Sequence, residues 1–204
     1  LFVCTYYTVK VKTSNISNMK AALSTTTTIY DNKNQKAGSL YSQKGSFVEL
    51  NQISPYIQDA VIATEDRTFY KNPGFSVKGM ARAAISSLIH RGIVGGGSTL
   101  TQQLAKNALL TQKQTFSRKL EELFFAIEIN RVYSKKDILT MYLNNAYFGN
   151  GVWGVQDAAR RYFGKNASDV TVGEAATIAG MLRSPSYYNP IDHMDNAISR
   201  RNVV

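Results

Sequence analysis

The sequence is poor in cysteine and histidine: it has one cysteine, Cys4, and two histidines, His90 and His193, in 204 residues. A single cysteine excludes a disulfide bond within the chain. Structural and catalytic zinc is held mostly by Cys and His, so the ligands of a typical zinc site are missing. No internal repeat is present, which argues against a repeat architecture.

Acidic residues are also scarce, because 14 Asp and Glu stand against 24 Lys and Arg and leave a net charge of +10. This balance favours an anionic partner: nucleic acid, an anionic membrane surface or a phosphorylated substrate. The chain has neither a base-stacking motif nor a continuous Lys/Arg block. We therefore expect no nucleic-acid partner.

Two familiar catalytic motifs are absent. The glycines at 95–97 are not followed by the Lys-Ser/Thr of a Walker loop. Ser98 does not lie in a Gly-x-Ser-x-Gly motif, and the Ser-x-x-Lys pattern at Ser17–Lys20 has no Lys-Thr-Gly companion. Neither a Walker phosphate loop nor a serine nucleophile is predicted.

The length allows one domain, or one domain with a small appendage. Residues 1–9 are apolar and aromatic but too few to span a bilayer as a helix, which needs about 20. We expect residues 1–12 to be the outer end of a truncated membrane anchor, with tyrosines at the interface. The alternative is a β-strand, because residues 8–12 alternate between polar and apolar side chains.

Residues 13–53 are predicted to form a linker and a small β element. The stretch 13–28 is rich in Ser, Thr and Asn, which is typical of a linker. Two β-like runs, Thr27–Tyr30 and Phe47–Leu50, are separated by turn residues.

From Pro55 onward the pattern is helical, and Pro55 itself suits a first helical turn. Ser134–Asp137 and Thr171–Glu174 resemble capping boxes that open two further helices. The predicted helices cover 54–64, 77–90, a helix from 98 or 99, 117–132, 134–145, a helix ending at 163, and a last helix at 174–182. The fold class is therefore mainly α.

Two carboxylates stand out among the apolar residues. Glu65 ends an apolar helical pattern, and such a carboxylate suits proton transfer; the alternative is a helix-end glutamate paired with Arg67. Glu122 shares a helix face with Phe125 and Ile129, so it should be buried. It is either functional or the partner of Arg118 four residues earlier, and the sequence leaves both interpretations open.

A glycine loop precedes a polar helix that supplies amides and a cation. The loop at 95–97 can present free backbone N–H groups to an anion, or it can be a plain connection. Cationic side chains near the two acids could neutralise a phosphate, although solvated surface is their default interpretation. These cations are Arg82, Lys106, Lys113, Arg118 and Lys119.

Five segments with unusual residue combinations follow one another along the helical region. They are Glu65–Phe69 with Gly74; Gly96–Gln103 with Lys106 and Asn107; Arg118–Glu122; Tyr142–Gly149 with Tyr162–Lys165; and Glu174–Gly180 with Pro185 and Tyr188–Pro190. Together they resemble, in family order, the five motifs of the peptidoglycan glycosyltransferases of family 51, the type found in penicillin-binding proteins. The chain departs from the family at Asn72, where His is common, and at Asn130, where an acid is common. The resemblance does not cover residues 1–26.

The resemblance implies a lysozyme-like, two-lobed glycosyltransferase fold over residues 54–204, whose C-terminal end the sequence leaves open. It implies polymerisation of lipid II into β-1,4-linked glycan, with inversion and release of undecaprenyl pyrophosphate. Glu65 would be the general base and Glu122 the second essential carboxylate. The implied substrate-binding residues are Asp66, Arg82, Ser98, Thr99, Gln102, Gln103, Lys106, Asn107, Arg118 and Asn144.

No cofactor is required by the resemblance, although a divalent cation, Mg²⁺ or Mn²⁺, could sit at the pyrophosphate and contact Glu122. The implied partners are lipid II, the growing glycan, an anionic membrane surface, a covalently linked transpeptidase domain and other cell-wall synthesis proteins. The implied location is the extracytoplasmic face of the bacterial cell membrane. Two alternatives are a lysozyme-like glycan hydrolase and a non-catalytic binder of anionic surfaces.

Two stretches mix apolar and basic residues and are candidates for the membrane interface. They are Ile85–Arg91 and Ala108–Phe116. The alternative is that their apolar residues Leu88, Ile89, Leu109, Leu110 and Phe116 belong to the core.

Overall fold

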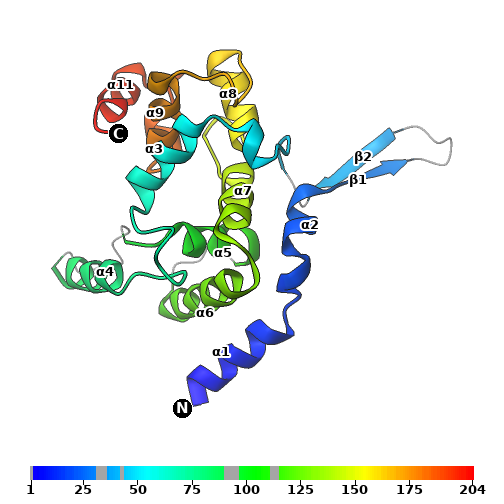
Figure 1. The fold of residues 1–204 in the computed structure, drawn as a ribbon, viewed down its shortest axis with the longest axis vertical. Coiled ribbons are helices and arrows are strands. Elements are labelled where there is room, and N and C mark those ends of the chain that lie inside the picture. The colour runs from blue at the N-terminus through cyan, green and yellow to red at the C-terminus, as the bar shows by residue number, and fades with distance from the viewer. Residues whose placement is uncertain (1, 31–35, 42–43, 90–96, 111–114) are drawn as a thin grey trace.

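The protein is mainly helical, with one two-stranded sheet near its N-terminus (Figure 1). The computed structural model describes residues 2–30, 36–41, 44–89, 97–110 and 115–204. The helices are α1 (Phe2–Thr13), η1 (Ile16–Asn18), α2 (Met19–Ser24), η2 (Leu50–Gln52), α3 (Pro55–Glu65), α4 (Val77–Ile89), α5 (Leu100–Leu109), α6 (Phe116–Val132), α7 (Lys135–Asn145), α8 (Val155–Phe163), α9 (Val172–Met181), α10 (Pro185–Tyr188) and α11 (Met194–Arg201). The strands are β1 (Thr26–Tyr30) and β2 (Lys36–Tyr41).

Helix α7 lies at the centre of the molecule (Figure 1), and its side chains from Ile138 to Asn144 are all buried. Below it in the view are α4, α5 and α6, of which α5 packs on both α6 and α7. Above it are α3, α8, α9 and α11, of which α9 packs on both α3 and α11. One hydrophobic core includes residues of α3, α5, α6, α7, α8 and α9, so the end of α3 and the start of α5 are held on a common support.

The helix starts follow the predicted capping signals. Ser54 accepts a hydrogen bond from the Tyr56 amide at the start of α3, with Pro55 in the first turn. Thr171 and Glu174 form a complete capping box at α9. The helices predicted over 54–64, 77–90, 117–132 and 134–145 are confirmed to within about two residues, the usual uncertainty of helix ends.

The N-terminal region contains a helix that packs on the body of the protein. Residues 2–13 form helix α1, so the β-strand alternative is wrong. Tyr7 stacks on Phe124 with ring centroids 5.6 Å apart, and its hydroxyl lies 2.6 Å from the Ser117 Oγ. Lys10 pairs with Glu121 at 2.6 Å. Helix α1 therefore covers one side of α6, and these tertiary contacts outweigh the weak helix propensity of its Thr, Tyr and Val residues.

The stretch predicted as linker also folds onto the body. Ile16, Met19 and Leu23, which belong to η1 and α2, are buried in the common core. The Tyr133 hydroxyl donates to the Ile16 carbonyl at 2.7 Å. The polar composition hid a helical spacing of three to four residues between these apolar side chains.

The sheet and the C-terminus bring two further differences. Strand β1 pairs antiparallel with β2, with Thr26 opposite Tyr41. The predicted strand at Phe47–Leu50 is not formed, because the backbone of Val48 pairs with the Asn144 side chain instead of a neighbouring strand. The helix at 174–182 is not the last, since α10 and α11 follow it.

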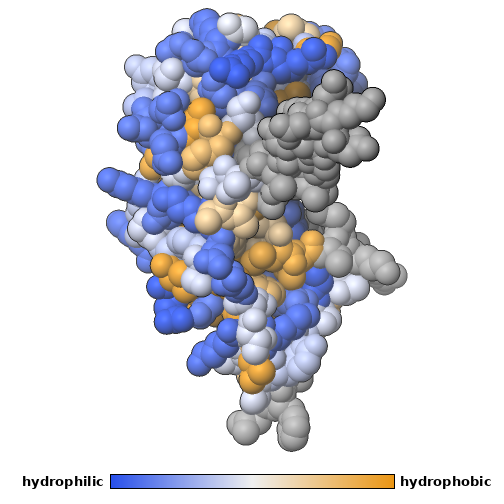
Figure 2. Space-filling model, turned by 90° about the vertical axis from the view of Figure 1, so that its right-hand side faces the viewer, coloured by the Kyte–Doolittle hydropathy of each residue, from blue (hydrophilic) through white to orange (hydrophobic). Residues whose placement is uncertain are grey.

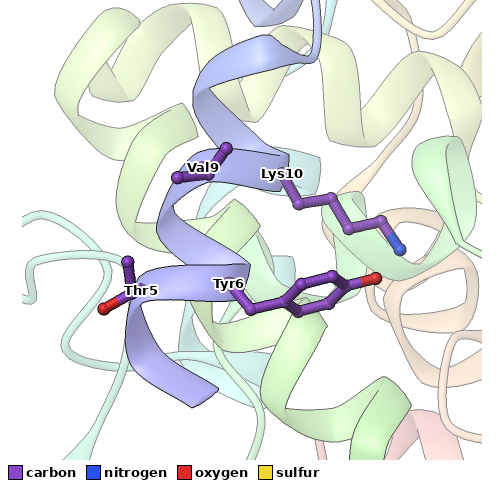
Figure 3. Close-up of a pocket in the computed structure, with 4 residues that line it drawn as sticks. All are labelled: Thr5, Tyr6, Val9 and Lys10. Carbon is purple, nitrogen blue, oxygen red and sulfur yellow. The ribbon is translucent and has the colours of Figure 1, made fainter. Parts of the chain in front are cut away.

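The side of the molecule shown in Figure 2 carries apolar residues in separate patches between hydrophilic ones. A shallow hollow on α1 is lined by Thr5, Tyr6, Val9 and Lys10 (Figure 3). It contains no carboxylate, so it lacks the groups for glycosyl transfer. None of the helices in the described parts of the chain has the length and apolar character needed to cross a membrane.

Candidate active site

The first predicted carboxylate, Glu65, is the last residue of α3 and is half-buried. Its Oε2 accepts a hydrogen bond of 3.1 Å from the Gln103 Nε2 on α5. The Gln103 Oε1 in turn accepts a hydrogen bond of 2.9 Å from the Tyr142 hydroxyl on α7. Three helices thus meet at one carboxylate whose hydrogen-bond partner is a neutral amide.

The neighbouring carboxylate, Asp66, is buried and tied to the protein itself. It accepts hydrogen bonds from the Leu100 amide at 3.1 Å and from the Asn72 side chain at 3.0 Å. A carboxylate at a helix N-terminus satisfies a free N–H and interacts favourably with the helix dipole. Asp66 therefore fixes the start of α5 next to Glu65, and its predicted role in substrate binding stays a prediction.

Thr99 and Gln102 form the predicted start of α5 as a complete capping box. Both are buried, at 3% and 2% exposure, and Thr99 also donates to the Gly74 carbonyl at 2.6 Å. Predicted as substrate-binding residues, they are placed by the structure in the protein's own hydrogen-bond network. They position Gln103, the next residue on α5.

The backbone of Gly97, just before α5, lies close to the backbone of Gly79 on α4. Gly97 has φ +132°, and a Cβ added there would lie 2.5 Å from the Gly79 carbonyl oxygen. Only glycine fits this approach between α4 and the residues before α5. Gly95 and Gly96 of the predicted anion loop lie outside the described residues, whereas Ser98 and Thr99 lie inside them.

The second predicted carboxylate, Glu122, is 1% exposed and is held by two cations. The Arg118 Nη1 donates to its Oε2 at 2.9 Å, and the Lys119 Nζ donates to its Oε1. Lys119 also donates to the Ser98 Oγ at 2.6 Å. The sequence left open whether Glu122 pairs with Arg118, and the structure shows that it does, with Lys119 as a second partner.

Lys106, on α5, feels the charges of both carboxylates. Burial lowers the pKa of its ammonium group, Glu122 opposes that shift, Arg118 and Lys119 add to it, and Glu65 opposes it weakly. Lys106 is therefore within electrostatic range of both acids and both cations. A bound anion would offset the repulsion among the three cations, so this cluster suits a phosphate-bearing ligand.

The structure brings together Glu65, Gln103, Lys106, Ser98, Arg118 and Glu122. Arg82 on α4 and Asn107 on α5 are exposed, and their predicted role stays a prediction. Asn144 is fully buried and pairs with the backbone of Val48 and Thr140, and its predicted role in substrate binding stays a prediction.

Sequence reasoning missed two members of the site. Lys119 was noted only as a source of charge, although its place next to Arg118 and three residues before Glu122 signals a shared helix face. Tyr142 was noted only as part of a motif. Its contact with Gln103 spans 39 positions along the chain, and no local pattern predicts such a contact.

Comparisons with known proteins agree with the resemblance. The transglycosylase family model matches residues 32–204. Penicillin-binding protein 2a of Streptococcus pneumoniae is 51% identical over 204 residues, which are 100% of this chain and 27% of that protein. Penicillin-binding protein 1F of Bacillus subtilis is 42% identical over 189 residues, 93% of this chain and 26% of that protein.

Penicillin-binding protein 1A of Aquifex aeolicus is 42% identical over 176 residues, 86% of this chain and 24% of that protein. The chain thus spans roughly a quarter of the length of these relatives. A crystal structure of penicillin-binding protein 1A from Haemophilus influenzae covers 89% of the chain at 22% identity and a TM-score of 0.40, so the assignment rests on the sequence matches. The chain belongs to the transglycosylase family, glycosyltransferase family 51, whose members here are penicillin-binding proteins.

Proposed function

We propose that this chain polymerises lipid II into β-1,4-linked glycan, with inversion at the anomeric carbon and release of undecaprenyl pyrophosphate. The observation that carries the proposal is the difference between the surroundings of two carboxylates that both act on Lys106. Glu65 has a neutral partner, whereas Glu122 is enclosed by cations. One region suits proton removal and the other suits a pyrophosphate.

Glu65 is the general base in this proposal. Its Oε2 is held by Gln103, and its Oε1 accepts no hydrogen bond from the part of the chain that the structure describes. Oε1 is thus available to take the proton of the acceptor sugar's 4-hydroxyl group. The acceptor oxygen then bonds to the anomeric carbon of the donor glycan while the bond from that carbon to the pyrophosphate oxygen breaks.

The cation cluster of Lys106, Arg118 and Lys119 stabilises the leaving pyrophosphate. The Arg118 Nε is buried and has no hydrogen-bond acceptor within the described residues, so it is a spare donor for a phosphate oxygen. Glu122 fixes the two cations of α6 in place and does not itself touch the reacting atoms. Arg82 and Asn107, both exposed, are proposed to extend this binding surface.

A divalent cation does not fit at Glu122. Both of its carboxylate oxygens face cationic side chains, and a metal would have to displace them. The described residues contain no group of three or more His, Cys, Asp or Glu placed to hold a metal ion. In the proposed reaction, the side-chain cations of Lys106, Arg118 and Lys119 stabilise the pyrophosphate.

A lipid-linked substrate requires the site to lie within reach of a membrane. Ile89 is 70% exposed and Phe116 is 77% exposed, and Val77 and Met80 on α4 are exposed as well. Leu110 differs, since it packs against the core. We propose that the exposed apolar residues of α4 and of the start of α6 enter the interface at the extracytoplasmic face of the bacterial membrane.

The proposed setting follows from the relatives. The relatives are named penicillin-binding proteins, and they are about four times as long as this chain. We propose that this chain, like them, is part of a longer protein and is covalently linked to a transpeptidase domain. Other cell-wall synthesis proteins are proposed partners. Residues 1–12 are proposed to be the outer end of a membrane anchor, and Phe2–Thr13 form a helix in the structure.

The lysozyme-like hydrolase is the rival activity. Such an enzyme needs a second carboxyl group on the opposite side of the scissile bond, and Glu122 has both oxygens committed to cations. Incubating the purified chain with lipid II in one reaction and with preformed glycan in another tests the choice. A ladder of glycan polymer with released lipid pyrophosphate supports the proposal, and shortening of preformed glycan without polymer would replace it with the hydrolase.

A further inference from the structure

Tyr142 is a core residue with one polar atom, and that atom points at the active site. Its side chain is 2% exposed and belongs to the hydrophobic core. A buried phenol hydroxyl needs a hydrogen-bond partner, because an unpaired polar group in the core is costly. The partner is the Gln103 Oε1 at 2.9 Å.

Only one arrangement of the Gln103 amide satisfies both of its neighbours. An ionised carboxylate accepts hydrogen bonds and donates none, so Glu65 requires the amide nitrogen. The amide oxygen is then left for Tyr142, whose hydroxyl must donate. The observed contacts, Nε2 to Glu65 and Oε1 from Tyr142, match this arrangement.

Tyr142 keeps its donor proton throughout the working pH range. Burial raises the pKa of the phenol well above its ordinary value, and the negative charge of Glu65 adds to the shift. The direction of the hydrogen-bond chain, from Tyr142 through Gln103 to Glu65, is therefore fixed.

We propose that Tyr142 and Gln103 are positioning residues that hold the Oε2 of Glu65 and thereby present its Oε1 to the acceptor hydroxyl. The inference rests on the proposed function of Glu65. The backbone around the amide is already fixed, by Asp66 at the Leu100 amide and by the capping box at Thr99. The Gln103 side chain can then still rotate, and the hydrogen bond from the Tyr142 hydroxyl restricts that rotation.

The test is a comparison of Tyr142→Phe, Gln103→Met and the double variant in lipid II polymerisation. Tyr142→Phe should lower kcat on the order of tenfold with KM unchanged, since misplacing a catalytic group costs rate rather than binding. This loss is smaller than the roughly 10²–10⁴-fold expected for removing the base itself. Because the two residues act in series, the double variant should be no slower than Gln103→Met alone.

Tyr162→Phe is the matched control. Its hydroxyl donates to the Phe148 carbonyl at 2.7 Å, in a region that the catalytic proposal does not use. It should lose stability comparable to Tyr142→Phe but keep the wild-type kcat. Equal kcat losses in the two variants, a wild-type kcat in Tyr142→Phe, or additive losses in the double variant would each overturn the inference.

A readout that needs no turnover separates this inference from the proposed function. The side-chain amide NMR signals of Gln103 should change in Tyr142→Phe and in Glu65→Gln, and stay unchanged in Tyr162→Phe. Unchanged Gln103 signals in Tyr142→Phe would overturn the positioning role even if Glu65 proves essential. Full turnover by Glu65→Gln, with the NMR changes present, would instead defeat the proposed base and leave the hydrogen-bond chain as structure.

Discussion

The two acidic regions of the site differ in what surrounds the carboxylate. Glu65 is half-buried at a helix end, and its partner is the neutral amide of Gln103. Glu122 is buried in mid-helix, between Arg118 and Lys119. A carboxylate with a neutral partner can take a proton without breaking an ion pair, whereas protonating one between two cations forfeits two charge-assisted hydrogen bonds. The same side chain therefore serves proton transfer in one region and cation placement in the other.

The largest effect is expected at the first region. Glu65→Gln keeps the shape of the side chain and removes the base, so turnover of lipid II should fall roughly 10²–10⁴-fold. The melting temperature should stay near that of the wild type, because the partner is a neutral amide. Turnover and thermal unfolding measured on the same preparation check both expectations. Near-normal turnover would contradict the assignment of Glu65 as the general base.

Lys106→Met tests whether Lys106 binds the phosphate groups of a ligand. The change removes a charge and keeps the apolar stem, so a phosphoglycolipid inhibitor should bind roughly 10- to 100-fold more weakly, as expected for one charged hydrogen bond. Lys136→Met, which removes an exposed cation on α7, is the matched control. Equal inhibitor affinity in the Lys106→Met and Lys136→Met proteins would remove Lys106 from the phosphate site.

Glu122→Gln should damage stability as well as rate. It leaves Arg118 and Lys119 without their carboxylate, which should lower the free energy of unfolding by about 1–3 kcal/mol. The loss is reduced because Lys119 is partly exposed to solvent. The neighbouring Glu121→Gln breaks the partly exposed pair with Lys10 and should cost less than about 1 kcal/mol. Denaturant unfolding of the two variants makes the comparison. Equal losses in the free energy of unfolding would show that the ion pairs of Glu122 contribute no more than an ordinary surface ion pair.

The smallest expected effect concerns the membrane. Phe116 is 77% exposed, so Phe116→Ser should leave the fold intact and weaken binding to anionic vesicles about tenfold, the order expected for losing one buried aromatic contact. Leu110→Ser should instead destabilise the fold, because Leu110 packs against the core. Vesicle co-sedimentation and thermal unfolding separate the two, and unchanged vesicle binding by Phe116→Ser would place the membrane contact elsewhere.

Local signals predicted most of the helical body. Pro55 and the caps at Ser134 and Thr171 mark where three helices begin, and the apolar spacing of α6 marks its buried face. The helix face shared with Phe125 and Ile129 predicted the burial of Glu122 correctly. Another side of α6, at Phe124, is covered by α1 through Tyr7.

Contacts between distant segments were not predicted. The alternating residues of α1 resemble a strand, yet they form a helix that packs on α6. Asp66, Thr99 and Gln102 carry polar side chains typical of a binding site, and their hydrogen-bond partners in the structure belong to the protein itself. Polarity in a motif therefore predicted that these residues matter, but not whether they touch a ligand or hold the residue that does.

The affinity of a phosphoglycolipid inhibitor for Glu65→Gln tests the division between the two regions most directly. If Glu65 acts only on the acceptor proton, the inactive variant should bind the inhibitor as tightly as the wild type, while Lys106→Met binds it roughly 10- to 100-fold more weakly. A loss of affinity in Glu65→Gln as large as that in Lys106→Met would contradict the account, because it would place Glu65 within the phosphate-binding cluster.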